Sequence, residues 1–177
     1  MTLFPRDAAS DRQAELGAGL TSLSSLLWQE RESLEAILFK LVTEQLIAGT
    51  GNVRFLQLAD DELRDAAATL RENEVLRAAE TQMLARLLDL PPDASLLQIA
   101  EVVDEPWPGL LREHRDALRA LFAEIETAAR ANRAVLLAGA EAARAALEHL
   151  APTVGTYDAR GGRVVVTPGI SLLDRQA

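Results

Sequence analysis

A seven-residue repeat of apolar positions in the last half of the chain constrains its fold more than any other feature. The repeat runs over five heptads, and its positions advance by alternating steps of three and four residues. Such a repeat is typical of a long helix in coiled-coil-like packing, and it predicts a helix over 107–150. The positions of the repeat hold Leu111, His114, Leu118, Leu121, Ile125, Ala128, Asn132, Val135, Gly139, Ala142 and Ala146.

Two earlier segments carry the same helical spacing. A leucine-rich stripe runs from Leu16 to Leu41 and stops at the turn sequence Gly49-Thr50-Gly51-Asn52. The next stripe places residues such as Phe55, Met83 and Leu84 on an inward face and ends before two prolines, which the helix cannot continue through. Ser95 and Gln98 then have the spacing of a capping box and predict a short helix.

We therefore predict an all-α fold, an elongated antiparallel helical bundle with three long helices and one short helix. The long helices are expected over 11–48, 53–89 and 107–150, and the short one over 96–104. Residues 1–150 would form the bundle domain, and 151–177 a flexible C-terminal tail that is irregular or folds on binding.

The composition of the chain excludes several classes of partner and of chemistry. The formal net charge of −9 argues against nucleic acid and anionic membrane surfaces as partners, because both need clustered basic residues. The absence of Cys excludes disulfides, thiol catalysis and Cys-zinc sites. The first twenty residues lack the apolar core of a signal peptide, and no apolar run could span a membrane, so a cytoplasmic protein is expected.

No catalytic or phosphate-binding motif occurs in the chain. Neither of the two His, His114 and His149, follows a Glu by three residues, so the ligand pairs of a helical di-iron site are missing. His114 lies on the apolar stripe and is predicted to be a core residue, and the acidic run at 60–62 a solvated face. We expect no enzyme, no cofactor and no metal site.

Three features leave alternatives open. From Ala128 onward the repeat holds mostly small residues, which suit either close packing inside a bundle or a surface that exchanges partners. Asn132 either fixes the register of the seam or lies at its edge. The tail holds two short apolar clusters, which either form a strand or dock on the bundle, or else become ordered on a partner.

The order of parts also resembles a known family. The run Leu27-Trp28-Gln29-Glu30-Arg31-Glu32-Ser33-Leu34 looks like the opening helix of FlgN-type flagellar export chaperones. The proline-rich break at 90–96 and the stretch 129–133 are similar to versions of that family, and Thr156-Tyr157-Asp158-Ala159-Arg160-Gly161 resembles the signature after its last helix. The apolar segment 164–177 is longer than the family pattern implies.

The resemblance implies a cytoplasmic chaperone that binds helical ends of hook-filament junction proteins and hands them to the flagellar export apparatus. It also implies that the C-terminal part of the chain holds the client. The alternative is a coiled-coil protein that self-associates as a homodimer through 110–150. The client-binding candidates are Val135, Leu136, Leu147, Leu150, Tyr157, Val164, Val165 and Val166.

Overall fold

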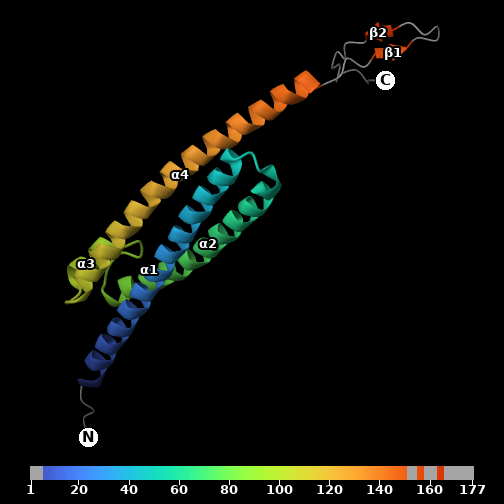
Figure 1. Ribbon diagram of the computed structural model, residues 1–177. Helices are drawn as coiled ribbons and strands as arrows, with labels where there is room; N and C mark the ends of the chain where they lie inside the picture. The colour runs from blue at the N-terminus through green and yellow to red at the C-terminus, as the bar shows by residue number, and fades with distance from the viewer. Residues whose placement is uncertain (1–5, 151–154, 158–162, 166–177) are drawn as a thin grey trace, which may run out of the picture. The chain divides into compact units, whose positions relative to one another are not determined.

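The computed structural model describes residues 6–150, 155–157 and 163–165, with side chains described over 10–148. Figure 1 shows the elements in chain order. They are α1 (Arg6–Gly49), the short 3-10 helix η1 (Val53–Phe55), α2 (Leu56–Leu87), α3 (Leu96–Val102), α4 (Trp107–Leu150), β1 (Gly155–Tyr157) and β2 (Arg163–Val165). The predicted all-α architecture with three long helices and one short helix is confirmed.

The helix ends follow local chemistry. Gly51 has a φ of 71°, a conformation that a glycine adopts at no steric cost, and it forms the turn after α1. Ser95 caps α3, because its side chain accepts from the Gln98 amide while the Gln98 side chain accepts from the amide of Ser95. The predicted capping box is therefore present.

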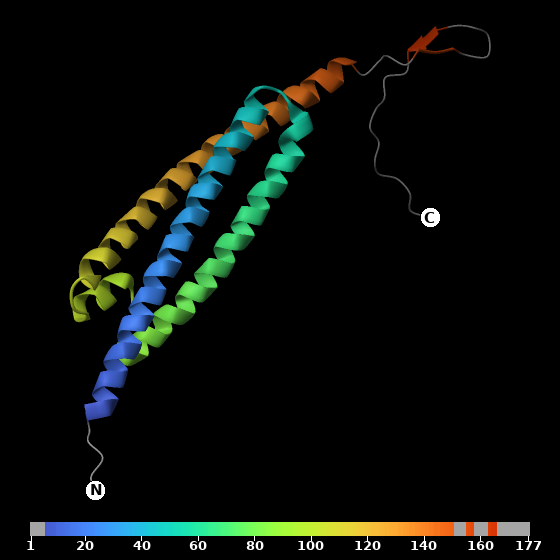
Figure 2. The same cartoon turned by 60° about the horizontal axis from the view of Figure 1, so that its bottom comes forward.

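The chain divides after Leu136 into two compact units. In the first unit, α1 and α2 are antiparallel, since contacts join Arg12 to Asp89 and Lys40 to Glu62. The part of α4 in this unit runs parallel to α1, because Ser24 lies against His114 and Glu44 against Asn132. Figure 2 shows α1 flanked by α2 and by this part of α4.

The apolar core of the first unit gathers where α3 joins the long helices. Leu23 and Leu27 of α1, Leu84 of α2, Ile99 of α3 and Leu111 of α4 are all fully buried there. Each buried Leu or Ile contributes about 1.5–3 kcal/mol relative to an exposed position, so this end holds the unit together.

The inward face predicted for the second long helix is confirmed at Leu84, which is fully buried. Two of its predicted residues are exposed: Phe55, which lies in η1, and Met83, whose methyl nevertheless lies against Gly19 of α1. Ala59, Thr81 and Ala85 are also buried. The α2 stripe contains few large residues, so its sequence does not mark one face clearly. Gly19 of α1 lies close to Leu84 and Met83, so this side of α2 faces α1.

The second unit contains the C-terminal part of α4 and a two-stranded antiparallel sheet. In that sheet Gly155 pairs with Val165, Thr156 with Val164 and Tyr157 with Arg163. Two short strands therefore lie within the segment for which the sequence predicted a tail.

Candidate protein-binding surface

The predicted seam of α4 is buried only over its first part. Leu111, His114, Leu118 and Asn132 are buried, and Val135 is half-buried. From Leu136 to Glu148 every side chain is exposed, including the seam positions Gly139, Ala142 and Ala146. One continuous repeat thus supplies both a core face and a surface.

His114 is the buried core residue that the sequence predicts. Its Nε2 lies 3.3 Å from the Ser24 hydroxyl oxygen, and its ring packs edge-on against Trp28 with 5.3 Å between the ring centroids. Burial lowers the pKa of His114, the Arg31 guanidinium lowers it further, and Glu113 acts in the opposite direction. His114 is therefore neutral at pH 7 and helps to join α4 to α1.

Asn132 lies on the seam and not at its edge. Its Nδ2 donates a hydrogen bond of 2.7 Å to Oε2 of Glu44, and both residues are buried. The Oδ1 atom of Asn132 is buried without a hydrogen-bond partner among the described residues. A shifted register would leave the buried Glu44 carboxylate without this hydrogen bond, so the contact favours one register between α1 and α4.

Glu44 and Glu30 were not predicted as buried residues from the sequence. Both continue the heptad spacing of α1, which runs through positions 20, 23, 27, 30, 34, 37, 41 and 44. A carboxylate at a seam position is the signal that could have identified them. In the structure both are buried, one facing α4 and the other facing α2.

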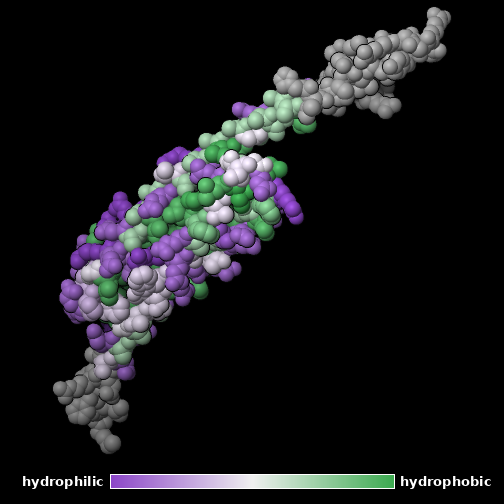
Figure 3. All heavy atoms as spheres, viewed as in Figure 1, coloured by the Kyte–Doolittle hydropathy of each residue, from purple (hydrophilic) through white to green (hydrophobic). Residues whose placement is uncertain are grey.

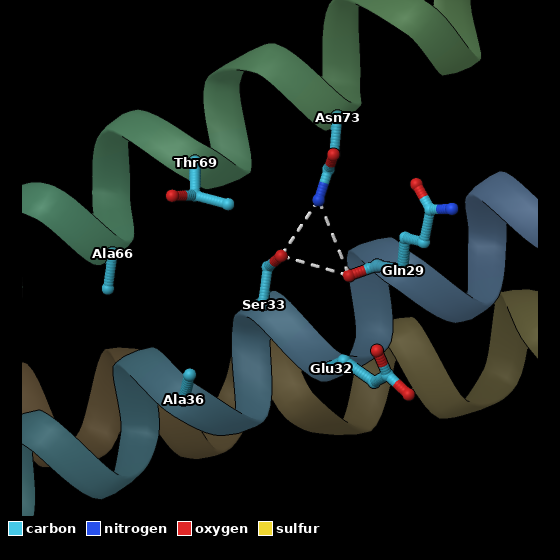
Figure 4. A pocket seen from close by; sticks show the side chains of 7 residues that line it. All are labelled: Gln29, Glu32, Ser33, Ala36, Ala66, Thr69 and Asn73. Atoms are coloured by element: carbon cyan, nitrogen blue, oxygen red, sulfur yellow. Dashed lines mark hydrogen bonds between the residues drawn. The ribbon is translucent and has the colours of Figure 1, made fainter.

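Glu30 forms an ion pair across α1 and α2. Its Oε2 lies 2.6 Å from Nε of Arg77, although the geometry is not that of a directed hydrogen bond. Burial raises the pKa of Glu30, while the Arg77 guanidinium acts in the opposite direction. Ser33 lies one helical turn after Glu30 on α1, and its hydroxyl accepts a hydrogen bond of 2.8 Å from the Asn73 side chain of α2. Both residues line an open depression of about 330 Å³ (Figure 4).

The exposed part of α4 is amphipathic. Positions 136, 140, 143 and 147 advance by steps of four and three, so Leu136, Ala140, Ala143 and Leu147 share one face. We call these four residues the α4 strip, and Val135 borders it. The carboxylates of Glu141 and Glu148 lie away from this face, whereas Arg133 and Arg144 border it. Figure 3 shows mostly hydrophobic residues, in green, along this part of α4.

The structure brings only some of the predicted site residues together. Val135, Leu136 and Leu147 lie on α4, and Leu147 is 68% exposed. Tyr157 lies on β1 and Val164 and Val165 on β2. Leu150 is the last residue of α4, its side chain lies outside the described residues, and Val166 lies outside them altogether.

The described residues offer neither a metal site nor a membrane span. Within them, no group of three or more His, Asp or Glu side chains is placed to hold a metal ion. None of the helices there is both long enough and apolar enough to cross a membrane. The acidic run at 60–62 is taken up by ion pairs, with Asp60 and Asp61 joined to Arg64 and Glu62 to Lys40.

Comparison with known proteins identifies the family of the chain. No curated protein and no solved structure matches the chain. Residues 19–164 match the family described as FlgN protein, a span that begins within α1 and ends within β2. Flagellar export chaperones make up this family. The chain therefore belongs to the FlgN family, and this membership implies the general role of a flagellar export chaperone.

Proposed function

We propose that this chain is an export chaperone whose α4 strip binds the amphipathic helical end of a hook-filament junction protein. The chaperone would act in the cytoplasm, keep the client from assembling early and pass it to the export apparatus. The observation that carries the proposal is the uninterrupted exposure of α4 from Leu136 to Glu148, with an apolar face and no partner among the described residues.

The local sequence explains how this segment stays helical while exposed. Between Ala134 and Leu147 it is rich in Ala and Leu, which have the highest helix propensities. The surface is therefore preformed, and a client helix would pair with it without the cost of ordering it. The small residues of the strip allow close approach but bury little area, which fits a partner that must be released.

Calorimetric titration with the C-terminal segment of a hook-filament junction protein from the same genome tests the proposal. The full chain is expected to bind one copy. The double variant Leu136→Asp/Leu147→Asp should weaken this binding at least about tenfold, because both charges would enter the apolar contact.

A matched control places the same two charges on the opposite face of the same helix. Ala138→Asp/Ala145→Asp changes two exposed residues and should leave the affinity within about twofold. Equal loss of binding in the two double variants would reject the α4 strip as the site.

The predicted client-binding residues beyond the α4 strip are tested separately. We propose that Tyr157, Val164, Val165 and Val166, together with Leu150, extend the client surface beyond the α4 strip. The truncated chain 1–150 should then retain weaker binding of the same client segment. Full affinity in that chain would confine the site to α4.

The same strip also suits a second copy of the chain, since exposed helical faces of small and apolar residues pair readily. Sedimentation of the protein alone decides between these functions. A stable client-free dimer that Leu136→Asp/Leu147→Asp dissociates, with no heat on client addition, would make self-association the better account.

A further inference from the structure

A second apolar surface lies in the first unit, on residues that the α4 strip does not include. A shallow groove of about 490 Å³ runs between the C-terminal half of α1 and the middle of α4. Its wall on α1 is Leu38, and its wall on α4 is built mostly of small residues. The lining residues are Leu38, Ala123, Glu124, Thr127, Ala128 and Ala131.

Large apolar side chains stand beside this groove on α1. Phe39 is 69% exposed, Val42 is 42% exposed and Leu46 is 65% exposed. Their spacing of three and then four residues places them on one side of the helix, and Val42 lies one turn after Leu38. Figure 3 shows hydrophobic atoms gathered along this half of α1. An exposed set of i, i+3 and i+7 anchors is the pattern with which helices recognise each other.

The border of the groove is acidic. Glu124 lines it, and Glu35 is exposed one turn before Leu38. Neither carboxylate has a basic partner among the described side chains, whereas the nearby Glu126 is paired with Arg130 at 2.5 Å. Two unpaired negative charges beside an apolar groove favour a partner with positive charges beside its apolar face.

We propose that this groove, together with Phe39 and Val42, binds an amphipathic helix of a partner protein whose apolar stripe is bordered by Lys or Arg. The small residues on α4 let the backbone of that helix approach closely, and the large residues on α1 pack against its apolar stripe. Glu35 and Glu124 face its basic border and select against acidic helices, the chain's own surface included, whose net charge is −9.

The test uses two synthetic fluorescent peptides of equal length that carry the same helical Leu stripe. One peptide has Lys beside the stripe and the other has Glu. Fluorescence anisotropy with the full chain should show saturable binding of the Lys peptide alone. Glu35→Lys/Glu124→Lys should weaken it at least about tenfold, and added salt should weaken it as well.

A matched pair of valines locates the contact. Val42→Asp should weaken binding of the Lys peptide at least about tenfold. Val75→Asp makes the same change at a valine of α2 that is 69% exposed and lies outside the groove, and it should leave the affinity within about twofold. Phe39→Ser is the second groove variant. Its side chain is mostly exposed, so this substitution weakens the peptide contact without unfolding the bundle.

Three results would overturn the proposal. Equal affinities of Val42→Asp and Val75→Asp for the Lys peptide would show that only general charge attraction is measured. Equal binding of the Glu peptide would remove the role of Glu35 and Glu124. A client-free dimer dissociated by Val42→Asp would show that a second copy occupies the groove. Client binding at the α4 strip should be unchanged in Val42→Asp, so the proposals for the two surfaces are tested independently.

Discussion

The two parts of α4 obey one heptad repeat and have opposite surroundings. From Leu111 to Val135 the seam positions pack within the first unit, and from Leu136 to Glu148 the residues are exposed. The bulky residues Leu111, Leu118, Leu121 and Ile125 lie in the packed part, and Gly139, Ala142 and Ala146 occupy the seam of the exposed part. A repeat therefore determines which face of a helix is apolar, and the size of its residues affects how strongly that face is held.

The largest expected effect comes from matched truncations in the two parts of α4. Leu111→Ala removes a side chain with no exposed surface and should lower the free energy of unfolding by about 2–5 kcal/mol. Leu147→Ala removes a side chain that is 68% exposed and should change it by less than about 0.5 kcal/mol. Chemical denaturation measures both values. Similar losses would contradict the contrast between a packed and an exposed part.

The next effect concerns the end of the packed part. Asn132→Ala leaves the buried Glu44 carboxylate without its hydrogen bond, and unfolding should become easier by about 1–3 kcal/mol. The double variant Glu44→Leu/Asn132→Leu should be near neutral or more stable, because both polar groups are removed together. Denaturation of Glu44→Leu, Asn132→Leu and the double variant gives the coupling energy of the pair. Additive effects would mean that the pair does not act as a unit.

A third comparison uses two glycines. A methyl group added at Gly139 would have no atom within 4 Å, so Gly139→Ala should stabilise the exposed helix by about 0.5–1 kcal/mol. A methyl at Gly19 would lie 2.9 Å from Cδ2 of the fully buried Leu84, so Gly19→Ala should lack this gain and lower the melting temperature. Circular dichroism on heating distinguishes the two, and equal stabilisation would reject the close contact between α1 and α2.

The smallest effect is a pH dependence of the packed part. The pKa of His114 is lowered in the folded chain by burial and by Arg31, with Glu113 opposing, so below about pH 6.5 the unfolded chain binds a proton that the folded chain does not. His114 should therefore destabilise the fold as the pH falls from 7.5 to 5.5. Glu30 has the opposite effect on stability. Its pKa is raised in the folded chain, so its protonation favours the folded state as the pH falls.

The variant His114→Gln isolates the histidine contribution, since Glu30 is present in both proteins. The stability advantage of the natural chain over His114→Gln should shrink as the pH falls through 6.5. Denaturation curves at several pH values measure this difference. A difference that stays constant with pH would show that His114 does not titrate differently in the two states.

Most of the architecture could be predicted from the sequence. The apolar repeats and the breaks at Gly49–Asn52 and Pro91-Pro92 predicted helices that the structure places at nearly the same residues. The Ser95 cap was predicted from spacing alone. The inward face predicted for the second long helix is right at Leu84 but includes Phe55, which is exposed in η1. The middle of this segment has few large residues, so its local pattern marks the face less clearly.

The candidate sites were less predictable. The sequence indicated the small-residue half of α4, but the two alternatives for it, close packing or an exposed surface, have the same local pattern. Burial separates them: the seam of this half is packed as far as Val135 and exposed from Leu136 to Glu148. The groove beside Leu38 was not predicted, because it is formed by residues about ninety positions apart in the chain.

The sequence by itself determined the helices, their apolar faces and their ends, because periodicity, capping and proline act within a few residues. The sequence also identified the family, whose match extends over residues 19–164. Only the tertiary structure decided which seam positions of α4 are buried in the first unit, which carboxylates of α1 are buried, and where Leu38 lies beside the alanines of α4. These features depend on which apolar faces pack against each other. Apolar surface is buried by contacts between helices that lie far apart in the sequence, so local patterns do not determine them.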